Sequence, residues 1–184
     1  MSAPRIALLT GRSDPARTGL PPTQAAFLAA VTPPGAAAIR DGYPWEGGLP
    51  EGHVPLPLAA WRNAAQWRAA RTCAARAMVA DRLASLRGGP LAIVTGSCGS
   101  DLLACGWIAG ICDLVVALGP VTRRRPPLAE ARLETVIGRQ DRVSRAMHRV
   151  APDRRVPCGH MGYWTCPATR AAVADVLRAL ARAQ

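Results

Sequence analysis

The stretch Leu91-Ala-Ile-Val-Thr95-Gly96-Ser97-Cys98-Gly99-Ser100 decides the fold of this chain. It begins with an apolar run of strand length and passes at once into small residues that are typical of a tight turn. The residues that follow, Ser100–Ala109, have a helical pattern. Because the apolar run shows no alternation, we expect a strand that is buried on both faces, as in a parallel sheet. A strand, a turn and a helix in this order predict an α/β fold whose ligands bind at the carboxyl ends of the strands.

The rest of the chain repeats this alternation of short apolar runs and helical patterns. The runs of strand length are Ile6–Leu9, Ala36–Ile39, Leu91–Thr95, Leu114–Leu118, Leu133–Ile137 and Arg154–Cys158, the last with Pro157 inside it. The helical patterns are Pro22–Val31, Leu58–Arg87, Ser100–Ala109 and Pro167–Ala183. We therefore predict a three-layer α/β fold, in which a mostly parallel sheet of about six strands carries helices on both faces.

Length and composition place the chain among the globular proteins. Its 184 residues, against about 150 for an average domain, predict one domain over residues 1–184. Hydrophobic residues make up 49% and charged residues 19%, which excludes intrinsic disorder. No apolar run approaches the roughly 20 residues that span a bilayer, and the apolar run at the amino terminus is too short for a secretory signal. We therefore expect a cytoplasmic protein without membrane contact, whose six cysteines are reduced thiols.

The charge of the chain is strongly basic. The 23 basic residues, all of them arginine, exceed the 12 acidic ones, and the formal net charge is +11. The arginines are scattered and the aromatic residues are few, so the charge indicates a bias in composition, and we predict no nucleic-acid partner. An acidic protein partner is a second interpretation of the same charge.

The turn after Thr95 carries candidate nucleophiles. Cys98 stands at the centre of the pattern small-x-nucleophile-x-small, which Gly96 and Ser100 complete. A side chain on such a sharp turn projects at the top of the sheet, next to the amino end of the following helix, where a thiolate is favoured. The N–H of Gly99 would then point at a developing oxyanion. Ser97 is the alternative nucleophile, because Thr95-x-Ser97-x-Gly99 also fits a loose elbow, and Cys98 as an inert buried thiol is the alternative to any catalytic role.

Two further strand ends carry an acid and a base. Asp141 lies in the turn Gly138-Arg-Gln-Asp-Arg-Val143, and His160 lies in the glycine-flanked loop Gly159-His-Met-Gly-Tyr163. Because parallel strands end at the same edge of a sheet, we expect Cys98, Asp141 and His160 to meet there. Asp141 could instead only cap a short helix.

These three motifs, in this order, resemble the α/β-hydrolase superfamily from about Leu91 to the end of the chain. The resemblance implies that Cys98 is the nucleophile, Asp141 the orienting acid and His160 the general base. It also implies a second oxyanion donor near Gly11 or Arg12, after the run Ile6–Leu9. The cysteine is similar to that of some dienelactone-hydrolase-like and thioesterase-like members. The chain has no room for the family's first two strands or for a lid domain, so the resemblance implies a minimal core with an open site.

The function that this resemblance implies is that of a thioesterase or an acyltransferase, which acts through an acyl-enzyme intermediate on a small or carrier-bound acyl group. Ser97, Met161 and Tyr163 are the expected substrate contacts, and no cofactor is expected. Cys158, His160 and Cys166 lack the second pair of ligands that a zinc site needs, so no metal is predicted. The alternatives are a catalytically silent hydrolase-like binding protein and a redox-responsive thiol protein. The exposed sheet edge leaves room for a homodimer.

Overall fold

The structure is a computed structural model, and it describes residues 2–14, 16–50, 52, 54–69, 72–122, 128–148 and 151–182. Its first half contains β1 (Arg5–Thr10), α1 (Pro22–Val31), β2 (Ala37–Ala38), α2 (Leu56–Ala69) and α3 (Cys73–Ser85). Its second half contains β3 (Leu91–Gly96), α4 (Gly99–Cys105), β4 (Leu114–Leu118), β5 (Arg132–Gly138), α5 (Arg142–Met147), β6 (Arg154–Val156) and α6 (Pro167–Arg182).

The strands form one six-stranded sheet in the order β2-β1-β3-β4-β5-β6, and every neighbouring pair is parallel. The predicted α/β class with a sheet of about six strands is thus confirmed. The register aligns the ends of the central strands, because Thr10 pairs with Gly96 and Gly96 with Leu118. Their carboxyl ends therefore meet at one edge, where the loops after β1, β3 and β4 begin.

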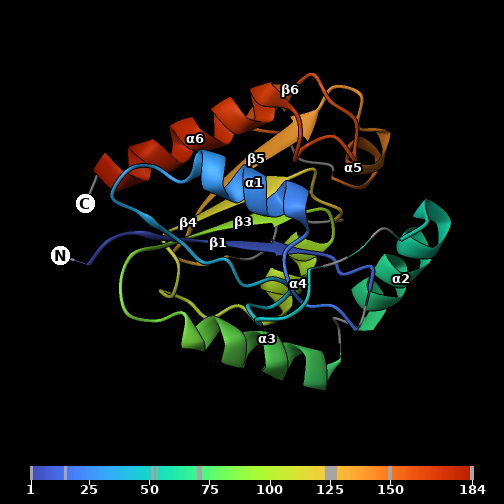
Figure 1. Cartoon of the computed structure of the whole chain (residues 1–184), viewed down its shortest axis with the longest axis horizontal. Coiled ribbons are helices and arrows are strands. Elements are labelled where there is room, and N and C mark those ends of the chain that lie inside the picture. Colours follow the sequence, from blue (N-terminus) through green and yellow to red (C-terminus); the bar gives the residue numbers. More distant parts are fainter. Residues whose placement is uncertain are drawn as a thin grey trace.

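Two apolar layers hold helices against the two faces of the sheet (Figure 1). Along β1, Ile6 and Leu8 join the core under α1 and α6, whereas Ala7 and Leu9 join the core on the side of α3 and α4. All residues of β3 and β4 are buried, which explains why these strands are apolar throughout instead of alternating.

The long helix expected over Leu58–Arg87 is wrong, because the structure has two helices there. The second, α3, begins at Cys73, and the Thr72 side chain accepts a hydrogen bond from Ala75 N as its N-cap. In Figure 1 α3 lies along one face of the sheet, and α2 stands at the end where the central strands finish.

Two other boundaries also differ from the sequence prediction. The strand expected over Arg154–Cys158 ends at Val156, because Pro157 has no N–H for the ladder and Cys158 N turns back to Val156 O. The strand expected over Ala36–Ile39 is only Ala37–Ala38. Three consecutive arginines, Arg123 to Arg125, come after β4 in the sequence and lie outside the described residues.

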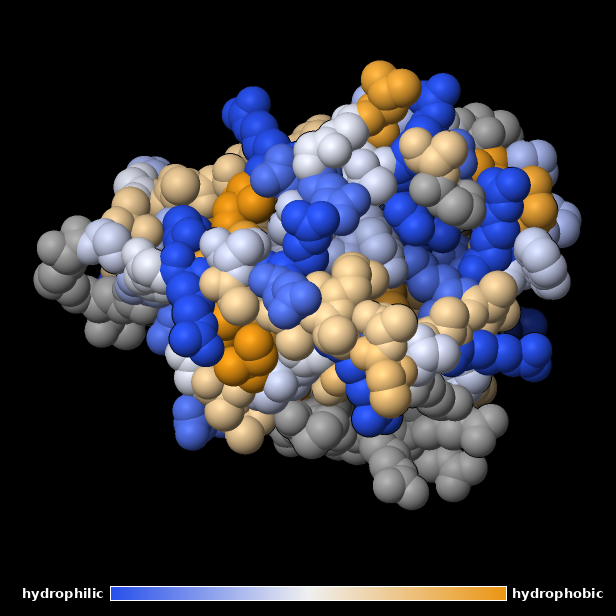
Figure 2. Space-filling model, turned by 90° about the horizontal axis from the view of Figure 1, so that it is seen from below, coloured by the Kyte–Doolittle hydropathy of each residue, from blue (hydrophilic) through white to orange (hydrophobic). Residues whose placement is uncertain are grey.

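The outer surface of the α3 layer is mixed in polarity. Figure 2 shows hydrophilic side chains interspersed with small apolar ones on this face, as expected for a helix that buries only Val79 and Leu83. Among the described residues, no helix is both long and apolar enough to cross a membrane.

Candidate active site

The tight turn between β3 and α4 places Ser97 in a strained conformation. Its φ is +52°, a left-handed value that residues other than glycine rarely adopt. Backbone hydrogen bonds hold it there, from Ser97 N to Leu118 O at 3.1 Å and from Val121 N to Ser97 O at 3.0 Å. The hydroxyls of Thr95 and Ser100, 2.7 Å apart, close the turn beneath it. Strain of this kind costs about 1–3 kcal/mol and is typical of functional turns.

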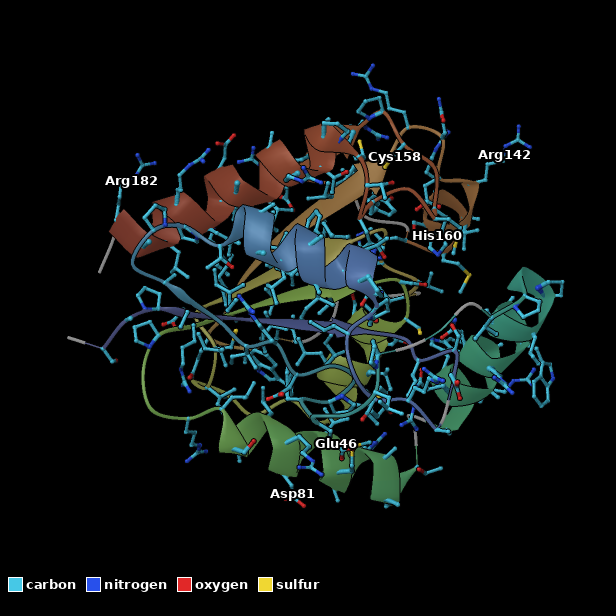
Figure 3. The ribbon with its side chains drawn as sticks, viewed as in Figure 1. Glu46, Asp81, Arg142, Cys158, His160 and Arg182 are labelled. Carbon is cyan, nitrogen blue, oxygen red and sulfur yellow. The ribbon has the colours of Figure 1, made fainter. Side chains whose placement is uncertain are left out.

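Ser97, His160 and Asp141 form a continuous hydrogen-bonded line. Ser97 Oγ lies 3.1 Å from His160 Nε2, and His160 Nδ1 lies 3.0 Å from Asp141 Oδ2. The side chain of His160 is 20% exposed and that of Asp141 is fully buried. Figure 3 shows His160 beside α5, at the same end of the molecule as α2. The predicted acid and base thus lie together, although they are separated by a strand and a helix in the sequence.

Asp141 is held by more than His160. Its Oδ1 accepts a hydrogen bond from Ser144 N at 2.9 Å, so it also caps α5, and its Oδ2 accepts one from Tyr163 Oη at 2.7 Å. Burial alone would raise the pKa of Asp141, but hydrogen bonds from His160, Tyr163 and Ser144 outweigh it and hold that pKa well below its ordinary value. Asp141 is therefore a fixed negative charge under the imidazole at neutral pH.

Cys98 does not occupy the place predicted for it. Its thiol is buried, with 4% of the residue exposed, and burial raises its pKa to about 11. The elbow is one residue earlier than expected: β3 ends at Gly96, so the residue at the apex is Ser97, and Cys98 turns inward as the N-cap of α4. The structure thus places Ser97 at the apex of the turn, flanked by Thr95 and Gly99, whereas Cys98 faces inward.

The shift also bears on the predicted oxyanion donors Gly99, Gly11 and Arg12, which stay a prediction. The N–H that follows the apex belongs to Cys98 instead of Gly99. Gly99 has a packing role, because a Cβ there would collide with the backbone oxygen of Leu9. Gly11 and Arg12 do lie beside the elbow, since the space for a Cβ on Gly11 is taken by Cys98 Sγ and by the Asn63 side chain. The N–H of Arg12 donates to Gln66 Oε1 at 2.7 Å.

The helix α2 contributes side chains that sequence reasoning missed. One of its faces contacts the loop after β1, where Arg62 donates to Ser13 O at 2.9 Å and Asn63 to Ser13 Oγ at 3.3 Å. Trp67 Nε1 donates to Asp101 Oδ2 in α4 at 2.6 Å. The helix α2 therefore stands next to the elbow, and the open site without a lid stays a prediction. These contacts join residues 34–50 positions apart, and no local pattern signals them.

The remaining predicted site residues fall into two groups. Met161 is 71% exposed next to His160, so its predicted contact with substrate stays a prediction. Tyr163 is 3% exposed, accepts a hydrogen bond from Gly138 N and donates one to Asp141 Oδ2, both at 2.7 Å, so it supports Asp141, and its predicted contact with substrate stays a prediction. Among the described residues, no cluster of three or more His, Cys, Asp or Glu side chains is arranged to hold a metal ion.

Solved structures with the same architecture can be compared with this chain. One is a protein from Xanthomonas campestris pv. campestris described as a hydrolase of the alpha/beta superfamily, with TM-score 0.57 and 19% identity over 96% of this chain and 99% of that one. Another is alpha/beta hydrolase domain-containing protein 10 from mouse, with TM-score 0.55 and 14% identity over 97% of this chain and 90% of that one. A third is the type II thioesterase BorB from the borrelidin biosynthetic cluster, with TM-score 0.53 and 14% identity over 98% of this chain and 92% of that one.

Comparison by sequence gives no relative, since neither a protein-family model nor a curated protein matches this chain. The similarity to the three solved structures extends over nearly the whole of each chain, and it establishes the fold. The fold is that of the α/β-hydrolase superfamily, and the elbow, the acid turn and the histidine loop lie at the carboxyl edge of its sheet.

Proposed function

We propose that this chain is a serine hydrolase that cleaves acyl esters or thioesters through Ser97, His160 and Asp141. The observation that carries the proposal is the line of two hydrogen bonds, 3.1 Å and 3.0 Å long, that joins the strained serine to the imidazole and to the buried carboxylate. A hydroxyl is a weak nucleophile by itself, and a base oriented by a third group is what activates it.

The reaction would proceed in two halves. Ser97 Oγ attacks the acyl carbonyl carbon while its proton passes to His160 Nε2, and Asp141 stabilises the resulting imidazolium. The tetrahedral intermediate collapses, the leaving alcohol or thiol takes the proton from His160, and an acyl-serine remains. Water then attacks the acyl carbon by the same route, giving a carboxylic acid and free Ser97.

The negative oxygen of the intermediate needs backbone donors. In folds of this kind they are the N–H that follows the nucleophile and an N–H from the loop after the adjacent strand. Here these positions are Cys98 and the Gly11–Arg12 pair. Since Arg12 N already donates to Gln66 Oε1, a substrate oxygen that uses this donor has to displace that side chain.

The names of two structural neighbours support esters and thioesters as the substrates. The neighbours include a type II thioesterase and a carboxylesterase, the latter from Mesorhizobium loti, with TM-score 0.50 and 19% identity over 97% of this chain and 90% of that one. The proposed substrates are therefore acyl esters and thioesters. Transfer of the acyl group to an acceptor other than water would proceed through the same acyl-serine.

The test uses a fluorophosphonate probe, which reacts covalently with activated serines, together with 4-nitrophenyl esters. We expect the probe to label Ser97, and Ser97→Ala to lose both labelling and ester turnover. Cys98→Ala is the matched control at the neighbouring position and should retain both. Absence of labelling in the unmodified protein would refute the proposal and favour a catalytically silent binding protein, and loss of labelling only in Cys98→Ala would restore the cysteine as nucleophile.

A further inference from the structure

A small polar pocket lies directly beside the elbow. It is formed by the loop after β1 and the start of α1, and its free volume of about 10 Å³ is close to what one water molecule needs. It borders the site, because Thr10 in its wall pairs with Gly96, the residue before Ser97. Its polar lining consists of Thr10, Arg12, Arg17, Thr18, Gln24 and Tyr43.

Two arginines give this pocket a positive charge. Among the described residues, no carboxylate forms an ion pair with Arg12, whose guanidinium instead lies over the Tyr43 ring, 4.3 Å from its centroid. Arg17 is 3.7 Å from Asp14 and donates to Pro50 O at 3.1 Å. The described part of the pocket therefore presents more positive than negative charge.

Arg12 is held in place on both sides. Its backbone N–H donates to Gln66 Oε1, and its guanidinium stacks on the Tyr43 ring. A cation fixed in this way loses little freedom when it binds an anion, and a planar guanidinium matches the geometry of a carboxylate.

We infer that this pocket receives a carboxylate of the substrate, so that the acyl groups accepted by the site carry a negative charge at the end away from the reacting carbonyl. The inference rests on the proposed function, and it narrows that function to half-esters or thioesters of dicarboxylic acids. The carboxylate lies against Arg12 and Arg17, and one of its oxygens fills the space that a single water would occupy. An acyl chain with a neutral apolar end cannot pair with either guanidinium.

The experiment compares charged and neutral esters of equal length. The 4-nitrophenyl half-esters of glutaric and adipic acid are each measured against their methyl-capped analogues, and turnover by Ser97→Ala is subtracted as background. We expect kcat/KM to favour the free acids by about 10-fold or more, the range of a hydrogen bond to a charged group. Arg12→Gln and Arg17→Gln should each lower this preference, and the matched control Arg68→Gln, on the exposed side of α2, should leave it unchanged.

The outcomes separate this inference from the proposed function. If the unmodified protein turns over both kinds of ester and the capped analogues are as fast as the free acids, the inference is overturned and the hydrolase remains. A preference that survives in both arginine variants also overturns it. If no ester is turned over above the Ser97→Ala background, the proposed function fails, and this inference fails with it.

Discussion

Removing the Tyr163 hydroxyl tests the support beneath the acid. Tyr163→Phe keeps the ring, which is 3% exposed, and deletes one oxygen that donates to Asp141 Oδ2 and accepts from Gly138 N, both at 2.7 Å. A hydrogen bond to a charged group is worth about 1.5–3 kcal/mol, and a buried N–H left without an acceptor costs about 1–3 kcal/mol. Because the two losses share one atom and the site can relax, we expect the free energy of unfolding to fall by about 2–4 kcal/mol at pH 7.

The pH dependence of this loss has a definite sign. The pKa of Asp141 is lower in the folded than in the unfolded chain, so its ionisation stabilises the fold above the unfolded value of about 3.9, and this stability disappears as the pH falls through the lower folded value. Tyr163→Phe removes one of the contacts that lower the folded pKa. Because the unfolded chain is the same in this respect for both proteins, the difference in stability between them should be constant at neutral pH and should shrink only as the pH falls through the folded pKa of Asp141 in the variant.

Urea unfolding between pH 3 and pH 7 measures both quantities. Tyr43→Phe is the matched control, because its hydroxyl faces the neutral Gln66 side chain and no carboxylate accepts from it among the described contacts. We expect it to cost about 1 kcal/mol or less. The reasoning would be refuted if Tyr163→Phe lost less than about 1 kcal/mol at pH 7, or if its deficit grew as the pH fell.

Three other predictions test the elbow and its neighbours. Gly99→Ala should lower the free energy of unfolding, measured by urea titration, because the added Cβ meets the backbone oxygen of Leu9. Overpacking usually costs about 1–3 kcal/mol, and we expect a larger loss here because the obstacle is backbone. The control Gly52→Ala has open space around its Cβ and should lose no stability. Iodoacetamide at pH 7 should modify exposed Cys73 far faster than Cys98, since Cys98 is buried and its pKa is raised to about 11; equal rates by peptide mass spectrometry would contradict the inward position of the thiol. Gln66→Ala should speed fluorophosphonate labelling of Ser97 by about 2- to 10-fold, the range of one net hydrogen bond, because it frees Arg12 N; an unchanged rate would mean that this N–H is not an oxyanion donor.

Much of the fold could be predicted from local patterns. Strands such as β3 and β4 are apolar at every position because both of their faces are covered, and this signal is present in the sequence alone. The positions of Asp141 and His160 followed from the same reasoning, because parallel strands end at one edge and a polar residue just past a strand end lies there. Helix boundaries were less predictable: the break between α2 and α3 depends on the Thr72 cap, within a pattern that otherwise continues.

The sequence by itself determined the layered α/β architecture and the edge of the sheet at which Asp141, His160 and the β3–α4 turn meet. Only the tertiary structure decided which of two adjacent residues is the nucleophile candidate, because the last pairing of β3 with β4 at Gly96 fixes the register of the turn. A shift of one residue in so tight a turn exchanges the side chain that points out with the one that points in. The positions of Gln66 beside Arg12 and of Tyr163 beneath Asp141 likewise come from contacts between distant segments, which chain folding creates and local sequence does not encode.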